Sequence, residues 1–366
     1  MKKKLGILLI ILFILEFSSF TILKLYPKNS DDVYFKRHNI YEDKILDNIS
    51  LIENYYNSPN YSKKLGWDNS RLDPRLNYLN ARSDKLNEKK KMKVITFGDS
   101  FTWGDGVEHD ETWSHYLSNE LDIYVANYGV GGYGPFQSYL KYKNLNADLK
   151  DTEVVILGMF EITIDRIRNN YLNFYFNSGF RLRPIPEENS TKLTYKELPD
   201  FTKSKDFKYD FINFIKENKH KDVWWQRRVE IKFPYSINLF KLFFIIFNDR
   251  FELSLIYNTS KNSWDNKITN KMLNDIIDNF VTISNNKGIK PYILFIPRIR
   301  YKLSSGYKYQ NFKISLIEKK YNVIDFADFI NTYDDKNNKN LILPDGHFSS
   351  KANILIGKFL AEKIKF

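Results

Sequence analysis

Beyond residue 90, short apolar runs alternate with longer stretches in which apolar residues recur every three or four positions. The short runs predict buried strands, and the longer period predicts amphipathic helices. Strands are expected at 93–97, 123–127, 153–158, 290–297 and 321–326. Helices are expected at 112–121, 135–146, 269–288 and 349–366. Alternating strands and helices predict an α/β fold, a parallel sheet with right-handed crossovers.

Residues 166–265 interrupt this alternation with aromatic-rich clusters and no repeat. The clusters read NNYLNFYF, DVWWQRR and INLFKLFFIIF. The last one is too short to span a membrane comfortably. We expect it to form core or a lid, with a surface that rests on lipid as the third possibility.

The amino terminus is the longest apolar stretch of the chain. Three lysines precede residues 5–23, in which only Glu16 breaks the apolar character. As a helix this stretch would be about 28 Å long, close to the hydrocarbon thickness of a bilayer. A cleaved signal peptide is the alternative, but no A-x-A-like site follows. The basic flank predicts a single-pass anchor with the body of the protein on the extracytoplasmic side.

These patterns predict three parts, namely a membrane anchor at 1–26, a polar spacer at 27–90 and a domain at 91–366 that contains the insertion. The net charge of +12 comes from 56 basic and 44 acidic residues. The basic residues are spread along the chain without a nucleic-acid-binding motif, so no nucleic-acid partner is expected. The absence of cysteine excludes disulfides, zinc–thiolate sites and cysteine nucleophiles.

Three polar segments are expected at the carboxyl ends of the predicted strands. They are Gly98-Asp99-Ser100, the glycine-rich 127–134 and 343–353 before the last helix. In open parallel sheets, function collects at the carboxyl ends of the strands. A serine at such a turn offers a hydroxyl nucleophile and a backbone N–H for an oxyanion. Asp99 is expected to brace the turn.

A serine nucleophile needs a base, and the base needs an orienting carboxylate. The five histidines are His38, His109, His115, His220 and His347. His347 has Asp345 two residues before it, whereas His109 and His115 have no comparable carboxylate setting. His347 is therefore the expected base and Asp345 its partner. The histidines show no metal-ligand spacing, and neither a metal nor a cofactor is expected.

These segments resemble a known family. Gly98-Asp99-Ser100-Phe101 is similar to the first sequence block of the SGNH (GDSL-type) hydrolases, a superfamily of esterases and related acyltransferases. NYGVGGYGPFQ resembles the second block and places Gly132 at the oxyanion glycine, and PDGHFSSKAN resembles the last block, which completes the triad. The resemblance covers about 91–165 and 268–366 and is closest to the membrane-anchored extracytoplasmic branch.

The resemblance implies a three-layer α/β/α, flavodoxin-like parallel sheet with an N-terminal transmembrane helix and a helical, aromatic-rich insertion. It implies a serine esterase in which His347 takes the proton of Ser100 while Asp345 orients the imidazole. The backbone N–H groups of Ser100 and Gly132 would receive the oxyanion. The implied substrate is a small-molecule or glycan ester, in particular an O-acylated surface polysaccharide.

One block departs from the family. The third block supplies an oxyanion Asn, but LGMFEITID at 157–165 contains none, and an ungapped match places Ile162 there. Thr163 is a weak candidate donor, Glu161 can donate only when protonated, and Asn169 lies just beyond. Losing one oxyanion donor typically costs about 2.7–4 kcal/mol of transition-state stabilisation. Activity is therefore expected to be reduced or rebuilt with other groups.

Three alternatives stand beside the esterase. The first is an O-acyltransferase on a surface glycan, and the second is a catalytically silent carbohydrate-binding protein on the hydrolase scaffold. The third is a dinucleotide site, because Gly129, Gly131 and Gly134 match the GxGxxG spacing and Asp148 follows. That fingerprint would follow the second strand of the sheet and not the first, which disfavours it.

Overall fold

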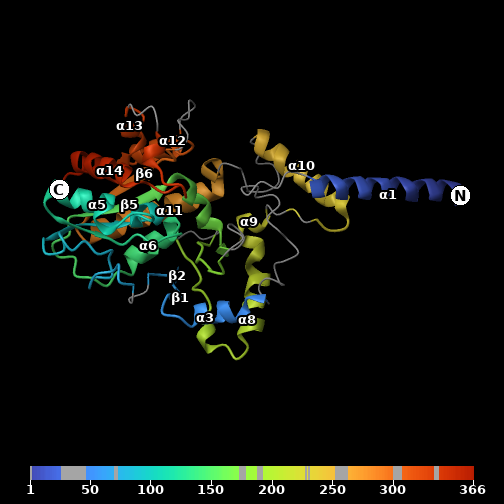
Figure 1. Ribbon diagram of the computed structural model, residues 1–366, viewed down its shortest axis with the longest axis horizontal. Helices are drawn as coiled ribbons and strands as arrows, with labels where there is room; N and C mark the ends of the chain where they lie inside the picture. Colours follow the sequence, from blue (N-terminus) through green and yellow to red (C-terminus); the bar gives the residue numbers. More distant parts are fainter. Residues whose placement is uncertain are drawn as a thin grey trace. The chain divides into compact units, whose positions relative to one another are not determined.

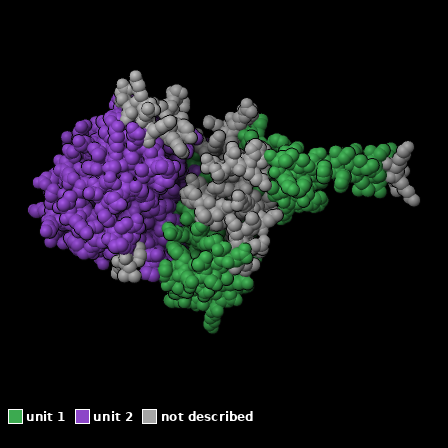
Figure 2. All heavy atoms as spheres, viewed as in Figure 1, with its two compact units in different colours: residues 1–58, 168–183, 199–266 green, residues 59–167, 184–198, 267–366 purple. Residues whose placement is uncertain are grey.

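The computed structural model describes residues 2–25, 47–69, 73–172, 179–187, 193–226, 229, 231–251, 263–299, 307–333 and 338–366. The chain divides into two compact units, coloured separately in Figure 2. Unit 1 comprises residues 1–58, 168–183 and 199–266. Unit 2 comprises residues 59–167, 184–198 and 267–366. Residues 184–198, which fall inside the predicted insertion, thus belong with the sheet-containing unit.

Unit 2 contains a five-stranded parallel sheet. Its strands are β3 (Met92–Phe97), β4 (Tyr124–Asn127), β5 (Val154–Phe160), β6 (Lys290–Ile296) and β7 (Asn322–Asp325). Their order in the sheet is β4-β3-β5-β6-β7. Numbered along the chain this is the flavodoxin-like order 2-1-3-4-5, whose ligands bind where the order reverses, at β3 and β5. The predicted α/β fold class and its parallel sheet are confirmed.

Helices cover both faces of this sheet (Figure 1). The main ones are α5 (Trp113–Leu121), α6 (Pro135–Lys143), α11 (Lys267–Asn286), α12 (Gln310–Glu318) and α14 (Ser350–Lys363). Shorter helices are α4 (Ser100–Trp103) and α13 (Ala327–Ile330), with 3₁₀ turns η2 (His109–Glu111), η3 (Glu161–Arg168) and η7 (Asn338–Leu341). Side-chain oxygens of Thr112 and Ser349 cap α5 and α14 by accepting backbone N–H bonds, as N-cap residues do.

The alternation of side chains along β3 separates two apolar layers. Val94 faces α5 and α14 and packs in a buried cluster with Trp113 and Leu117. Phe97 points to the opposite face, where its ring lies 5.2 Å from that of Tyr142 on α6. Because successive strand residues point to opposite faces, an apolar run such as 93–97 is required for a sheet covered on both sides.

The end of the predicted spacer packs within unit 2. This part of the spacer begins with a two-stranded antiparallel ribbon formed by β1 (Tyr61–Ser62) and β2 (Gly66–Trp67). Further along, the backbone N–H of Arg82 donates to the carbonyl of Asn127 at the end of β4 over 2.8 Å. The segment before β3 therefore adds structure to the sheet domain.

In the described residues of unit 1, the regular elements are helices, and an isolated antiparallel bridge joins Tyr171 to Leu182. Its helices are α1 (Lys2–Leu25), α3 (Ile49–Tyr56), α8 (Phe207–Asn218), α9 (Val223–Gln226) and α10 (Tyr235–Phe251), with 3₁₀ turns η4 (Phe201–Lys203), η5 (Lys219–Lys221) and η6 (Ser263–Asp265). An aromatic cluster joins α3 to α8, with the Tyr56 ring 5.0 Å from Phe201 and 5.3 Å from Phe211. Within the described residues, one helix, Lys4–Leu25, is long and apolar enough to cross a membrane.

Candidate active site

The turn after β3 is shaped by close packing around Gly98. A side chain there would clash with the hydroxyl of Thr102 and come within 2.9 Å of the Gly158 carbonyl. Asp99 follows in an extended conformation, and its carboxylate accepts the N–H of Phe101 over 2.9 Å. Asp99 thus caps α4 and braces the turn, as expected from the sequence. Ser100 is the first residue of that short helix.

Ser100 lies at the end of the sheet where the strand order reverses. Its side chain is buried to 6 % exposure in a turn between β3 and α4. Among the described residues, none forms a hydrogen bond with its hydroxyl. A serine hydroxyl that is not used by the fold is available to a substrate or a base.

Asp345 and His347 form the pair predicted from the sequence. The carboxylate accepts the His347 backbone N–H through Oδ1 and contacts ring Nδ1 through Oδ2, both over 3.0 Å. These hydrogen bonds, the backbone one first, hold the pKa of Asp345 below its usual range. The single residue between them, Gly346, has φ +96°, a conformation that favours glycine. The one-residue spacing therefore suffices for a carboxylate to orient the imidazole.

Phe101 connects the His347 loop to the Ser100 turn. The imidazole of His347 lies 5.2 Å from the Phe101 ring, centroid to centroid. Phe101 also stacks on Phe160 at 3.7 Å and meets Phe348 edge-on at 4.9 Å. The imidazole thus sits beside the residue that follows Ser100. No hydrogen bond joins the Ser100 hydroxyl to His347 in the described structure; catalytic hydrogen bonds are often long in the absence of substrate.

The glycine-rich loop after β4 packs against the Ser100 turn. The Val130 N–H donates to the Gly98 carbonyl over 3.1 Å. A side chain at Gly129 would clash with the backbone nitrogen of Trp103. Gly132 has φ +83°, so a residue with a Cβ would be strained there. The backbone of the predicted oxyanion loop is thus fixed beside the serine turn.

Contacts inside the protein also explain the GxGxxG spacing. A Cβ at Gly131 would lie 3.1 Å from a carboxylate oxygen of Asp105, and one at Gly134 would lie 2.6 Å from Cβ of Arg166. A carboxylate beside the loop repels a pyrophosphate. Arg166 requires a glycine at position 134, and Asp105 leaves little room for a side chain at position 131, so neighbouring side chains account for both glycines and argue against the dinucleotide alternative.

Arg166, from η3, is a site residue that the sequence analysis missed. Its Nη1 donates to the Tyr133 carbonyl over 2.7 Å and lies 3.9 Å from Asp99 Oδ2. Both side chains are almost fully buried. Burial raises the pKa of Asp99 to about 6, although the Arg166 charge opposes the rise. A buried guanidinium therefore lies beside both loops of the site.

The third-block residues have other functions in the fold. Ile162 packs against the apolar core. Thr163 donates its only hydroxyl proton to the Phe160 carbonyl over 2.8 Å. Glu161 accepts the Arg298 N–H over 3.1 Å. Asn169 lies in unit 1, where its amide donates to Asp222 and to the Tyr171 carbonyl, both over 2.9 Å. The side-chain protons of Thr163 and Asn169 are thus already committed.

Arg82 and Asn127, also missed, hold α4 from its far end. Arg82 donates to the carbonyls of Trp103, Gly104 and Val107 over 2.6–2.8 Å. The Asn127 amide donates to the Thr102 carbonyl over 2.7 Å. Both residues satisfy carbonyls at the end of the helix that carries Ser100, which fixes the position of the serine.

Asp105 adds a second carboxylate near the base. Its carboxylate lies beside Gly131, and His347 is close enough to influence its electrostatics. Burial raises the pKa of Asp105. The positions of Asp105 and His347 in the sequence did not predict this electrostatic interaction.

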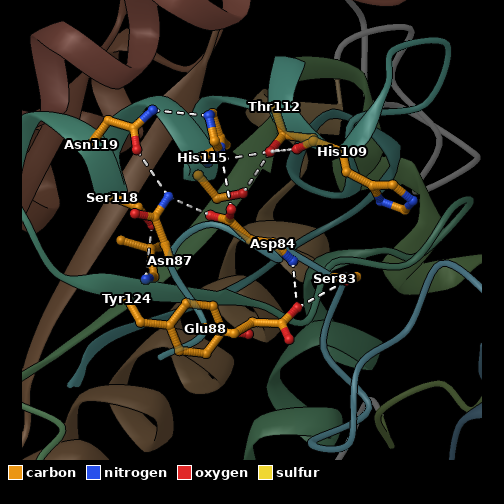
Figure 3. A network of polar contacts seen from close by, with 12 residues as sticks. Ser83, Asp84, Asn87, Glu88, His109, Thr112, His115, Ser118, Asn119 and Tyr124 are labelled. Atoms are coloured by element: carbon orange, nitrogen blue, oxygen red, sulfur yellow. Dashed lines mark hydrogen bonds and ion pairs between the residues drawn. The ribbon is translucent and has the colours of Figure 1, made fainter. Parts of the chain in front are cut away.

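Asp84 and His115 form a second aspartate–histidine pair (Figure 3). Nδ1 of His115 donates to Asp84 over 3.0 Å, and Nε2 accepts from Asn119 over 2.9 Å. Asn87 closes the ring by donating to both Asp84 and Asn119. The expectation that His115 lacks a carboxylate was wrong, because Asp84 comes from the predicted spacer. Both ring nitrogens are used and the ring is 5 % exposed, so the pair is structural.

No protein-family model matches the chain, and no curated protein matches it. Similar solved structures include a protein from Desulfitobacterium hafniense DCB-2 that is described as a lipolytic protein of the G-D-S-L family. It is 14% identical to this chain, the match covers 75% of this chain and 100% of that chain, and the TM-score is 0.39. A G-D-S-L family member from Veillonella parvula DSM 2008 is 12% identical, with 74% of this chain and 97% of that chain covered and a TM-score of 0.35. TesA is 10% identical, with 74% of this chain and 98% of that chain covered and a TM-score of 0.36. Because these TM-scores are low, the function is inferred from the residues of this chain.

Proposed function

We propose that the chain is a membrane-anchored serine esterase. Ser100 is the nucleophile, His347 the general base and Asp345 the residue that orients the imidazole. The observation that carries the proposal is the Asp345–His347 pair, whose ring lies beside Phe101. Phe101 directly follows Ser100, a buried serine whose hydroxyl forms no hydrogen bond within the described residues.

The reaction follows from these positions. The Ser100 hydroxyl attacks the ester carbonyl while His347 Nε2 accepts its proton, and Asp345 stabilises the imidazolium through Nδ1. The backbone N–H groups of Ser100 and Gly132 receive the oxyanion. His347 then protonates the departing alcohol, and water attacks the acyl-enzyme with His347 again as base. Neither Thr163 nor Asn169 has a free side-chain proton for the oxyanion, so the backbone donors carry this function.

The proposed substrate class is an O-acyl ester, and its proposed location is outside the cytoplasmic membrane. The apolar helix Lys4–Leu25 supports a membrane anchor by length and composition. Three lysines at its start support an extracytoplasmic body by the positive-inside rule. An O-acylated surface polysaccharide meets both conditions. Transfer of the acyl group to a glycan hydroxyl uses the same acyl-enzyme and differs only in the acceptor.

Two measurements on the full chain in detergent test this proposal. A fluorophosphonate probe should label the wild type and the Ser350→Ala variant, but not Ser100→Ala. Ser350 begins α14, three residues after His347, and is thus a matched serine outside the proposed chemistry. A short-chain chromogenic ester should be hydrolysed in the same pattern. Equal rates for wild type and Ser100→Ala would overturn the triad, and absence of labelling would support the silent binding protein.

A second test separates hydrolysis from transfer. Glycan oligosaccharides added to the ester assay should leave the release of free acid unchanged if water is the acceptor. Appearance of acylated oligosaccharide, with a matching decrease in free acid, would assign the acyltransferase instead.

A further inference from the structure

Helix α10 is attached to the predicted membrane span at its middle. The Glu16 carboxylate, midway along α1, accepts the backbone N–H of Tyr235 and also binds the Ser236 hydroxyl. Four residues on, the Phe20 ring lies 5.0 Å from that of Tyr235. Leu23 then packs in a buried cluster with Leu242 and Ile245. Residues later in α1 contact residues later in α10, so the two helices run in the same direction (Figure 1).

The start of α10 is built for a medium without water. The first N–H groups of a helix have no intrahelical partner, and an unsatisfied one costs several kcal/mol in lipid. Glu16 satisfies Tyr235, and Pro234 before it has no N–H at all. The carboxylate, expensive in a bilayer when isolated, gains hydrogen bonds and the positive end of the helix dipole. Each partner thus removes the main cost of placing the other at membrane depth.

The face of α10 turned away from α1 is apolar and exposed. Its residues are Ile237, Phe240, Phe243 and Phe247, with 64 %, 71 %, 54 % and 52 % exposure. The opposite face carries Leu242 and Ile245, which are buried against α1. Between Tyr235 and Phe247 the polar residues are Ser236, Asn238 and Lys241, and the helix is otherwise apolar on both faces, as is typical of a membrane segment. The exposed face continues the apolar surface of α1, where Ile11 and Phe13 are similarly exposed.

The apolar part of α10 is long enough to run from the level of Glu16 to the end of α1. Glu16 lies nine residues before Leu25, about 14 Å along α1, and half the hydrocarbon thickness is about 15 Å. The apolar stretch Tyr235–Phe247 is about 20 Å long, so it reaches the same interface. Lys241 stands about 8 Å beyond Ser236, within reach of the headgroups for a lysine stem. The sequence turns polar immediately afterwards, at Asn248-Asp249-Arg250.

We propose that α10 is a half-span that lies beside α1 in the leaflet where α1 ends, with Ile237, Phe240, Phe243 and Phe247 against lipid acyl chains. The chain would then enter that leaflet a second time, to the depth of Glu16. The proposal rests on insertion of α1 and is independent of the esterase chemistry.

The absence of native cysteines allows a direct test in the full chain. Single-cysteine variants carrying the fluorophore NBD are reconstituted in phosphatidylcholine–phosphatidylglycerol vesicles with doxyl-labelled acyl chains. Phe240→Cys is the test position, Ile11→Cys on α1 the lipid control, and Lys150→Cys, a 75 % exposed side chain of unit 2, the aqueous control. NBD at 240 should emit at shorter wavelength and lose intensity to the doxyl groups as NBD at 11 does, whereas NBD at 150 should do neither.

Depth provides a second readout. Label at Phe233→Cys, near Glu16, should lose more emission to 12-doxyl than to 5-doxyl chains, and label at Phe247→Cys should show the reverse. If 240 behaves as 150 does while 11 is quenched, the half-span is overturned. If 240 shifts to shorter wavelength without doxyl quenching, protein, such as a second copy of the chain, covers the face and the proposal fails. If 11 is not quenched, the anchor and the half-span fail together.

Discussion

The guanidinium of Arg166 donates to the backbone carbonyl of Tyr133 over 2.7 Å. Tyr133 follows Gly132, and Asp99, 3.9 Å from the same guanidinium, precedes Ser100. Arg166 therefore links the two segments whose N–H groups are the proposed oxyanion donors. It comes from η3, the turn that follows β5 directly.

Arg166→Met should lower kcat for a short-chain ester about 100-fold and leave KM nearly unchanged, because misplaced oxyanion donors weaken binding of the transition state more than binding of the substrate. Arg166→Lys should recover part of the loss, since a lysine ammonium can still donate to Tyr133. Arg75→Met, at a half-exposed arginine, is the matched control. A kcat for Arg166→Met within the range of that control would show that the link is not needed.

Asp345 is 58 % exposed, in contrast to the buried aspartate of well-studied triads. Asp345→Asn should still lower kcat by more than about 100-fold, because an amide favours the wrong imidazole tautomer, but by less than the about 10⁴-fold loss seen for a buried aspartate. The Asn oxygen can still accept the His347 N–H, so the turn should persist. Unchanged Tm together with the loss of kcat would support this; unchanged kcat would remove Asp345 from the mechanism.

The elements of the sheet domain could be predicted because each depends on local pattern. The run 93–97 and the strand β3 nearly coincide, and the short spacing of Asp345 and His347 places both on one turn. Contacts between distant segments could not be predicted in this way. Asp84 meets His115 only through tertiary packing, and Arg82 reaches α4 from a segment without long apolar runs. Neither residue has a periodic or motif-based signal, since its partner is fixed by the fold.

The Asp84–His115 pair should govern stability and not catalysis. Asp84→Ala leaves the His115 N–H and one Asn87 proton without a buried acceptor, at a cost of about 1–3 kcal/mol for each unsatisfied group. Burial alone would raise the pKa of Asp84, but the hydrogen bonds from His115 and Asn87 together outweigh it and hold this pKa below its usual range, so the carboxylate is charged at neutral pH. Tm should fall while kcat, measured well below Tm, stays within about twofold. Loss of kcat at unchanged Tm would instead place this pair in the chemistry.

Asp99 should give the stability of the fold a measurable pH dependence. Burial raises its pKa from 3.8 to about 6, so the folded protein holds this proton more tightly than the unfolded chain. The contribution of this group to stability is therefore full below about pH 4 and is lost as the pH rises through about 6. Asp99→Asn has no proton to lose, and its oxygen can still accept the Phe101 N–H. Relative to wild type, its free energy of unfolding should increase by up to about 3 kcal/mol between about pH 4 and about pH 7. Thermal unfolding of both proteins in detergent across this pH range checks the prediction. A Tm difference between the two proteins that does not vary with pH would show that folding leaves the proton affinity of Asp99 unchanged.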